Sequence, residues 1–203
     1  MTIQPDWAKG GGLLPMVVQH AQTGEVLMLG YVDEAAVKET EASGLVTFFS
    51  RSKQRLWTKG ETSGNLLRLV DLHLDCDGDT FLARVEPAGP TCHQGTSSCF
   101  GDSVRPPLAF LAELDALVAR RHAERPAGSY TTALFDGGTR GIAQKVGEEG
   151  VEVALAGVVQ DDTALLGEAS DLIFHLTVLL RDRGLDLSAV AAVLAERHAT
   201  SRR

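Results

Sequence analysis

The sequence predicts a two-domain protein, with a mainly β (α+β) N-terminal domain and an all-α C-terminal domain. Short segments rich in Val, Leu and Phe, separated by Gly, Asp or Ser, fill residues 13–85. After residue 105, apolar residues recur at helical spacing. The Pro106-Pro107 pair between them suits a linker, because proline lacks an N–H group and restricts the preceding residue. We therefore expect domains at residues 1–106 and 107–203.

The first half contains four segments with the composition of strands and one with that of a helix. The helix is predicted over residues 34–43, EAAVKETEAS. The strands are predicted over residues 13–20, 25–32, 45–52 and 66–75.

The second half is expected to be helical throughout. The clearest set of apolar residues recurs at spacings of three and four, which places these side chains on one face of an amphipathic helix. They are Leu165, Ala169, Leu172, Leu176 and Leu179. Helices are predicted over residues 108–124, 141–160, 161–184 and 187–199.

Composition and charge limit the class of protein. Hydrophobic residues make up 44% of the 203 residues, which is ordinary for a folded globular protein. The net charge of -8 argues against nucleic acid as a partner, because phosphate-backbone binding needs a basic face. Residues 1–15 contain no apolar run long enough for a signal peptide or membrane span, so a cytoplasmic location is expected. Three cysteines, an odd number, favour metal binding or core thiols over a disulfide framework.

Acidic and thiol side chains gather in residues 71–100. In an extended chain, alternation would place Asp75, Asp77 and Asp79 on one side and Cys76 on the other. Carboxylates suit Mg²⁺, whereas thiolates suit Zn²⁺. Three thiolates plus water are typical of a catalytic zinc, which lowers the pKa of bound water to about 7. From spacing alone, a solvated loop and buried core thiols remain alternatives.

A polar segment upstream, residues 48–65, has the composition of a phosphate-binding loop. It combines Arg51, Lys53, Arg55 and Lys59 with hydroxyl side chains and two glycines. Cationic side chains, hydroxyls and close backbone N–H groups hold phosphate. A plain polar turn between strands has a similar composition.

The stretches VLMLGYVDEA, FFSRSKQRLWTKGETSGN, DCDGD and TCHQGTSSCF resemble the phosphoribosyl-AMP cyclohydrolase family over about residues 13–105. The resemblance implies that Asp75, Asp77 and Asp79 bind Mg²⁺. It also implies that Cys76, Cys92 and Cys99 bind Zn²⁺ at a dimer interface. The sequence departs from the family pattern at Asp33, where Asn is usual, and at Gln94, where Thr is usual.

The same resemblance indicates a substrate site. Next to a proposed zinc ligand, His93 is a candidate proton shuttle, because histidine titrates near neutral pH; packing beside the metal is the alternative. The candidate substrate-binding residues of this domain are Arg51, Ser52, Trp57, Lys59, Gly60, Glu61, Thr62 and Ser63.

Carboxylates recur on two of the predicted helices. Glu148, Glu149 and Glu152 fall within little more than one turn, and Glu168 and Asp171 are three residues apart. Solvated acidic faces are the usual outcome of such spacing. Here the flanking residues are mostly Val and Leu, and crowded like charges repel unless a cation neutralises them. A magnesium site is therefore expected.

Two further polar residues lie beside these carboxylates. Lys145 precedes Glu149 by one turn, so it forms either a helix ion pair or a phosphate contact. His175 follows Asp171 by four residues and either supports a metal ligand or is a satisfied core histidine, the more frequent case.

The stretches SYTTALFDGGTRGIAQKVGEEGVEVALA and EASDLIFHLTVLL resemble phosphoribosyl-ATP pyrophosphatase, a family of all-α nucleoside triphosphate pyrophosphatases, over about residues 108–200. The resemblance implies that the five carboxylates hold Mg²⁺. It makes Glu149 the candidate residue that positions or deprotonates water, and Lys145 a substrate-binding residue. Gly150 stands where Ala is usual.

Together the halves resemble fused bifunctional hydrolases of histidine biosynthesis. The expected reactions are hydrolysis of phosphoribosyl-ATP to phosphoribosyl-AMP and pyrophosphate, and then opening of the adenine ring at N1–C6. A homodimer acting on small nucleotides is expected, without nucleic-acid or membrane partners. The alternatives are a general nucleoside triphosphate pyrophosphatase with a structural zinc module, and a non-enzymatic metal-binding protein.

Overall fold

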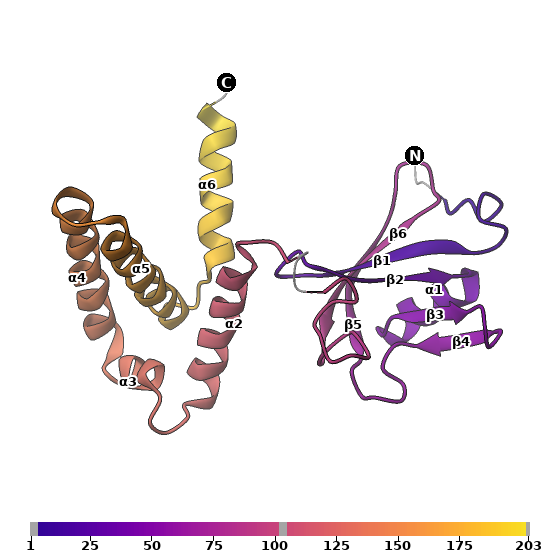
Figure 1. Cartoon of the computed structure of the whole chain (residues 1–203), viewed down its shortest axis with the longest axis horizontal. Helices are drawn as coiled ribbons and strands as arrows, with labels where there is room; N and C mark the ends of the chain where they lie inside the picture. The colour runs from indigo at the N-terminus through magenta and orange to yellow at the C-terminus, as the bar shows by residue number, and fades with distance from the viewer. Residues whose placement is uncertain (1–3, 102–104, 202–203) are drawn as a thin grey trace. The chain divides into compact units, whose positions relative to one another are not determined.

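The computed structural model describes residues 4–101 and 105–201. The chain divides into two compact units, Met1–Ala109 and Phe110–Arg203 (Figure 1). Strands and one helix form the first unit, and helices follow from residue 109 onward. The predicted fold class, a β-rich region followed by an all-α region, is confirmed.

The first unit is built on a four-stranded sheet of order β2-β1-β6-β5, with a separate two-stranded sheet, β3-β4. In the main sheet β1 and β6 pair in parallel, and the other neighbours are antiparallel. The elements are β1 (Leu14–His20), β2 (Val26–Val32), α1 (Glu34–Ser43), β3 (Thr47–Ser50), β4 (Arg55–Thr58), β5 (Leu67–Leu74) and β6 (Phe81–Pro87).

Alternating apolar side chains give this unit its core. Met16 and Val18 of β1 and Ala83 and Val85 of β6 are fully buried, as a strand with one face on the core requires. Asp33 caps the start of helix α1, because its carboxylate accepts a hydrogen bond from the N–H of Ala36 at 2.7 Å. Because Asn caps a helix equally well, the Asp33 departure from the family pattern leaves this cap intact.

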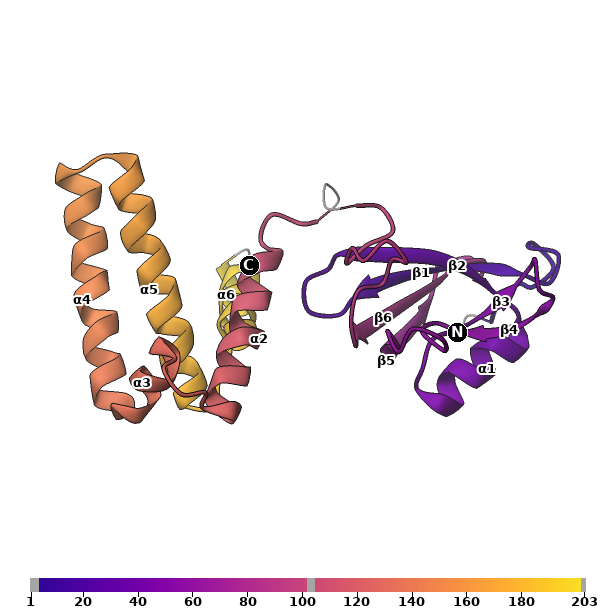
Figure 2. The same ribbon diagram turned by 60° about the horizontal axis from the view of Figure 1, so that its bottom comes forward.

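The second unit consists of α2 (Ala109–Glu124), α3 (Tyr130–Asp136), α4 (Gly138–Val159), α5 (Asp162–Asp182) and α6 (Leu187–Ser201). Helices α4 and α5 lie side by side and antiparallel, joined by a short turn (Figures 1 and 2). A small core joins four of the helices through Val118, Phe135, Ile142 and Val178. One helix of the described chain, α5, is long and apolar enough to cross a membrane, but core helices of soluble proteins pass the same test, so this is weak evidence.

The predicted helix over 34–43 and the four predicted strands are all present, as are the four helices predicted in the second half. Three elements were not predicted: β4, the central strand β6 and the seven-residue helix α3.

Candidate active sites

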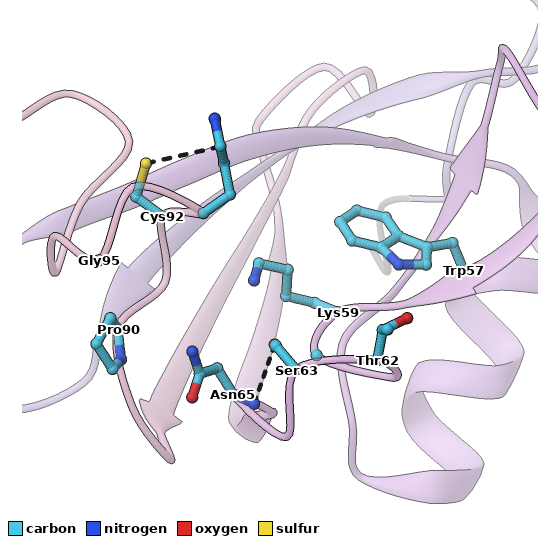
Figure 3. Close-up of a pocket in the computed structure, with 10 residues that line it drawn as sticks. Trp57, Lys59, Thr62, Ser63, Asn65, Pro90, Cys92 and Gly95 are labelled. Atoms are coloured by element: carbon cyan, nitrogen blue, oxygen red, sulfur yellow. Dashed lines mark hydrogen bonds between the residues drawn. The ribbon is translucent and has the colours of Figure 1, made fainter.

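A pocket of 370 Å³ opens in the first unit between β4 with its following turn and the loop after β6 (Figure 3). It contains five of the predicted substrate-binding residues together with Cys92 and His93. The lining residues are Trp57, Lys59, Gly60, Thr62, Ser63, Asn65, Pro90, Cys92, His93 and Gly95.

Tight backbone turns shape the lysine side of this pocket. Gly60 has φ 88°, and a Cβ there would lie 2.3 Å from the carbonyl oxygen of Asn65, so the turn requires glycine. The N–H of Lys59 bonds the carbonyl of Val46 at 2.9 Å, which fixes the start of the turn. Figure 3 shows the Lys59 side chain extending from the Trp57 side of the pocket toward Cys92. Lys59, Thr62 and Ser63 therefore line one cavity.

Three predicted substrate residues do not line the pocket. Arg51 lies over the Tyr31 ring, with its guanidinium carbon 4.0 Å from the ring centroid. Glu61 pairs with the Arg55 guanidinium across the turn. The Ser52 hydroxyl lies 3.4 Å from that of Ser50.

Asn65, Pro90 and Gly95 line the pocket but were not predicted as site residues. Asn65 closes the polar segment quoted above, so its position there was the available indication. Nothing local in the sequence indicates Pro90, because the loop after β6 reaches the pocket only in the folded unit.

The loop after β6 holds two of the cysteines close together. Hydrogen bonds from the backbone N–H of Gln94 and the hydroxyl of Thr96 lower the pKa of the Cys92 thiol. Burial raises the pKa of the Cys99 thiol, and the adjacent Cys92 raises it further. Only the backbone of Gln94 takes part, so the change from the family's Thr leaves this contact in place. Of the two cysteines, Cys92 therefore forms a thiolate more readily than Cys99.

Three hydrogen bonds fix the Cys99 end of this loop to the start of β2. The Ser97 hydroxyl donates to the buried Glu25 carboxylate at 2.9 Å, and the Ser98 hydroxyl donates to the Val26 carbonyl at 2.7 Å. The N–H of Cys99 donates to the Leu27 carbonyl at 2.8 Å. His93 is next to Cys92, with Nδ1 3.9 Å from its Sγ. Both thiols are thus held by a loop that β2 anchors.

Cys76 lies apart from these two, in the turn between β5 and β6. All three cysteines belong to the described residues, yet their sulfur atoms do not form a cluster of metal-ligand spacing. Cys76 and Cys99 are exposed. Within a single chain, the predicted three-cysteine set is not brought together.

Residues 75–80 form a tight turn, so the extended arrangement considered from the sequence is not the one adopted. Gly78, at φ 78°, supplies the left-handed residue that lets β5 turn back into β6. Asp75 Oδ1 accepts the N–H groups of Asp79 and Thr80 at 2.9 and 3.2 Å. The turn nevertheless gathers Asp75, Asp77 and Asp79, whose carboxylate oxygens lie within 4.8 Å of one another.

In the second unit, α4 and α5 bring Glu149, Glu152 and Glu168 together, with carboxylate oxygens within 4.8 Å of one another. Glu149 is buried, at 6% exposure. A hydrogen bond with Glu149 raises the pKa of Glu152, and desolvation and the charges of Glu149 and Glu168 raise it further. Crowded carboxylates of this kind are stabilised by a proton or a metal cation.

The other two predicted carboxylates fall outside this group. Glu148 bonds the Lys145 ammonium at 2.9 Å and the Gln144 amide at 2.8 Å. Lys145 also lies 3.7 Å from Glu149. Asp171 is exposed on α5.

His175 connects this cluster to α3. Its Nδ1 lies 2.9 Å from the Asp171 carbonyl oxygen and 3.5 Å from Glu149 Oε1, and its Nε2 lies 3.0 Å from the Tyr130 hydroxyl. Because a carbonyl only accepts, Nδ1 carries a proton. His175 is therefore both a satisfied core histidine and a neighbour of a candidate metal ligand, which unites the two alternatives considered from the sequence.

Comparisons with known families match both units. Residues 28–101 match the family model for phosphoribosyl-AMP cyclohydrolase, and residues 111–198 match that for phosphoribosyl-ATP pyrophosphohydrolase. The chain is thus a two-domain hydrolase, with the cyclohydrolase domain before the pyrophosphohydrolase domain.

Curated relatives match the chain across both units. The chain is 63% identical over 193 residues to the histidine biosynthesis bifunctional protein HisIE of Xanthomonas axonopodis pv. citri, covering 95% of this chain and 92% of that protein. It is 58% identical to the protein of the same name from Escherichia coli K12, covering 95% of each. The chain belongs to the HisIE family of bifunctional histidine-biosynthesis enzymes, which confirms both resemblances noted in the sequence.

Proposed function

We propose that the second unit hydrolyses phosphoribosyl-ATP to phosphoribosyl-AMP and pyrophosphate, and that the first unit opens the adenine ring of phosphoribosyl-AMP at N1–C6. The observation that carries this proposal is that each unit builds its own polar site from its own residues. Family membership supports the pair of reactions. The order of the units is then the reverse of the order of the chemistry.

The carboxylate cluster on α4 and α5 has the donor set for Mg²⁺, since three carboxylate oxygens lie within 4.8 Å of one another. Mg²⁺ would be held by Glu149, Glu152 and Glu168, with Glu148 and Asp171 as further candidate ligands, and would stabilise the charge that develops on the departing pyrophosphate. Glu149, buried within the group, positions or deprotonates the attacking water. Lys145 binds a phosphate oxygen through its ammonium group.

Cys92 and Cys99 are suitable zinc ligands, because Cys92 favours the thiolate and thiolates prefer Zn²⁺. Zinc held by Cys76, Cys92 and Cys99 would acidify water for attack on the adenine ring. His93, which also lines the pocket, moves the proton between water and the leaving ring nitrogen. Lys59, Thr62 and Ser63 bind the phosphate of the substrate.

The aspartate turn fits a hard cation by the same test, since Asp75, Asp77 and Asp79 offer three carboxylate oxygens within 4.8 Å of one another. We propose Mg²⁺ as its occupant. This site is built from the same turn as Cys76, so the two metal sites of the first unit are adjacent in the chain.

We further propose that the enzyme is a homodimer whose zinc site is shared, with Cys76 from one chain and Cys92 with Cys99 from the other. The separation of Cys76 from the other two thiols supports this arrangement. The second unit also exposes apolar side chains in regular order on its two longest helices, and large patches of this kind mark interfaces. They are Val151, Leu155 and Val158 on α4 and Leu166 and Ile173 on α5.

Mixed refolding tests the shared site. Cys76→Ala and Cys92→Ala proteins, each inactive in ring opening, are unfolded together and refolded as a mixture. A shared site leaves one of the two sites of each mixed dimer with all three cysteines, so part of the ring-opening activity returns. Continued inactivity, with mixed dimers detected by mass spectrometry, contradicts sharing and leaves the cyclohydrolase assignment standing.

Separation of the activities tests the assignment of the two reactions. Cys92→Ala should abolish ring opening, followed by absorbance, and leave pyrophosphate release intact; Glu149→Gln should do the reverse. Loss of both activities in a folded variant contradicts the two-site reading. Ordinary nucleoside triphosphates, assayed in parallel, separate this reading from a general pyrophosphatase with a structural zinc module.

The setting we propose is a soluble cytoplasmic enzyme that acts on small nucleotides. The net charge of -8 is unsuited to a nucleic-acid surface, and a reducing compartment keeps the three thiols available to zinc.

A further inference from the structure

The N-terminal segment, residues 4–12, packs on the aspartate turn. The N–H of Asp6 bonds the carbonyl of Gly78 at 2.7 Å. At Gly78 the two backbones are so close that a Cβ would lie 2.6 Å from the carbonyl oxygen of Gln4. The Trp7 ring packs near Phe81, the first residue of β6, with centroids 6.0 Å apart. The segment is therefore attached to the turn by its backbone and by an aromatic contact.

This attachment places the ammonium group of Lys9 on the aspartates. Lys9 Nζ lies 2.8 Å from Asp77 Oδ2 and 3.5 Å from Asp79 Oδ2, and it donates to the Asp77 carbonyl at 3.0 Å. Its hydrogen bond to Asp77 raises the pKa of Lys9 above its ordinary value. Asp75 is held differently, with one oxygen occupied by backbone N–H groups of the turn. Lys9 thus contacts the two aspartates whose carboxylates accept no backbone N–H group of the turn, although Asp79 Oδ1 also accepts the Thr80 hydroxyl at 3.1 Å.

We infer that Lys9 is an internal cation that sets the affinity of the aspartate site, and that a divalent cation binds there by displacing the ammonium group from Asp77 and Asp79. The inference rests on the proposed role of these aspartates as metal ligands. Mg²⁺ binds carboxylate oxygens at about 2 Å, so it needs the same oxygen surface that the ammonium group occupies. Two cations on one pair of carboxylates also repel each other.

Lanthanide luminescence measures occupancy of this site alone. The chain has two tryptophans, Trp7 and Trp57. In full-length Trp57→Phe protein, excitation of tryptophan sensitises Tb³⁺ only close to Trp7, and the helical unit contains no tryptophan. Tb³⁺ prefers oxygen ligands, and Mg²⁺ competes it off to give the affinity for Mg²⁺. Asp79→Asn in the same background should abolish the emission and so identify the site.

In this background Lys9→Met should lower the dissociation constants for both Tb³⁺ and Mg²⁺ by about threefold or more, a modest change because exposed lysine–carboxylate contacts are individually weak. Lys9→Arg, which keeps the charge, should retain the parent values. The matched control is Lys38→Met, which removes an exposed lysine whose ammonium bonds Glu34 at 2.6 Å, and it should leave both constants unchanged. Circular dichroism verifies that each variant is folded.

Each other outcome has a distinct meaning. Unchanged or weaker binding in the Lys9→Met protein overturns the role of Lys9 and leaves the metal site standing. An equal gain in the Lys38→Met protein indicates a general effect of charge and also overturns it. If the Tb³⁺ emission is absent, or if it persists in the Asp79→Asn protein, both the metal site and the inference built on it are overturned. If Lys9→Met does not fold, Lys9→Gln supplies the same comparison.

Discussion

Replacement of His175 by its two amide analogues separates support of a metal ligand from simple packing. In His175→Asn the side-chain amide nitrogen falls near the position of Nδ1, which faces the Asp171 carbonyl and Glu149. In His175→Gln it falls near that of Nε2, which faces the Tyr130 hydroxyl. His175→Leu retains bulk and removes both contacts. If His175 holds Glu149 through Nδ1, only the Asn variant preserves that function.

The magnitudes follow from these contacts. His175 is 5% exposed, and its loss removes two hydrogen bonds of about 1 kcal/mol each, so His175→Leu should lower the free energy of unfolding by about 2 kcal/mol. Loss of a group that orients a metal ligand typically weakens metal binding by about 10-fold or more. His175→Leu and His175→Gln should both show this loss, whereas His175→Asn should stay within about threefold because the Nδ1-side donor remains.

Calorimetric titration with Mg²⁺ measures the affinity, in an Asp79→Asn background so that the aspartate turn does not contribute. Chemical denaturation measures stability separately, and pyrophosphate release at saturating Mg²⁺ shows whether activity follows affinity. Equal affinities in the Asn and Gln variants, or an unchanged affinity in the Leu variant, would refute the argument and make His175 a packing residue only.

Three further outcomes are expected. A zinc-selective chelator should stop ring opening before pyrophosphate release, because thiolates prefer zinc and carboxylates prefer magnesium; equal loss of both activities in folded protein contradicts this. Glu149 raises the pKa of Glu152, so protons compete with Mg²⁺ for the carboxylates of α4 and α5 at pH values above the usual pKa of a glutamate. The calorimetric affinity for Mg²⁺ should therefore rise with pH through the raised pKa of Glu152 and level off above it. An affinity for Mg²⁺ that does not change with pH above the usual pKa of a glutamate contradicts the raised pKa of Glu152. Ile142→Ala, at a fully buried position, should lower the free energy of unfolding of the helical unit by about 2–5 kcal/mol in denaturant titration, and a loss below about 1 kcal/mol would show that this core is not tightly packed.

Local chemistry in the sequence was sufficient to predict most elements. Helix α1 was predicted at its observed bounds, and the structure supplies the physical reason for them: Asp33 caps its start, and Gly44, in the left-handed conformation at φ 70°, ends it. Helix α3 was missed because seven residues are too few to show helical periodicity, although Ser129 caps it.

Pairing between distant segments was much harder to predict. Strand β6 was missed, although Phe81, Ala83 and Val85 alternate toward the core. Its central position comes from parallel pairing with β1, more than sixty residues earlier in the chain. The contact of Lys9 with Asp77, at a separation of 68 residues, was equally inaccessible to local reasoning.

Residue spacing predicts part of the carboxylate cluster on α4 and α5. Glu149 and Glu152 are three residues apart and share a face, and the cluster with Glu168 follows once α4 and α5 pack together. Glu148 is one residue from Glu149, which turns its side chain by about 100° around the helix axis. It therefore pairs with Lys145 and Gln144 on a neighbouring face. Glu148 and Glu149 lie four and three residues before Glu152, so helix geometry places both near it. Which of the two joins the cluster is decided by the packing of α5, which supplies Glu168.

The cysteines show a different limit, because the predicted three-cysteine set does not come together within the one chain that the structure describes. A loop anchored on β2 holds Cys92 and Cys99, while the β5–β6 turn holds Cys76 elsewhere on the same unit. Among the described residues of this one chain, the three sulfur atoms do not form a group at metal-ligand spacing. We therefore propose that a second chain supplies Cys76 to each Cys92–Cys99 pair, and the mixed-refolding experiment tests this arrangement.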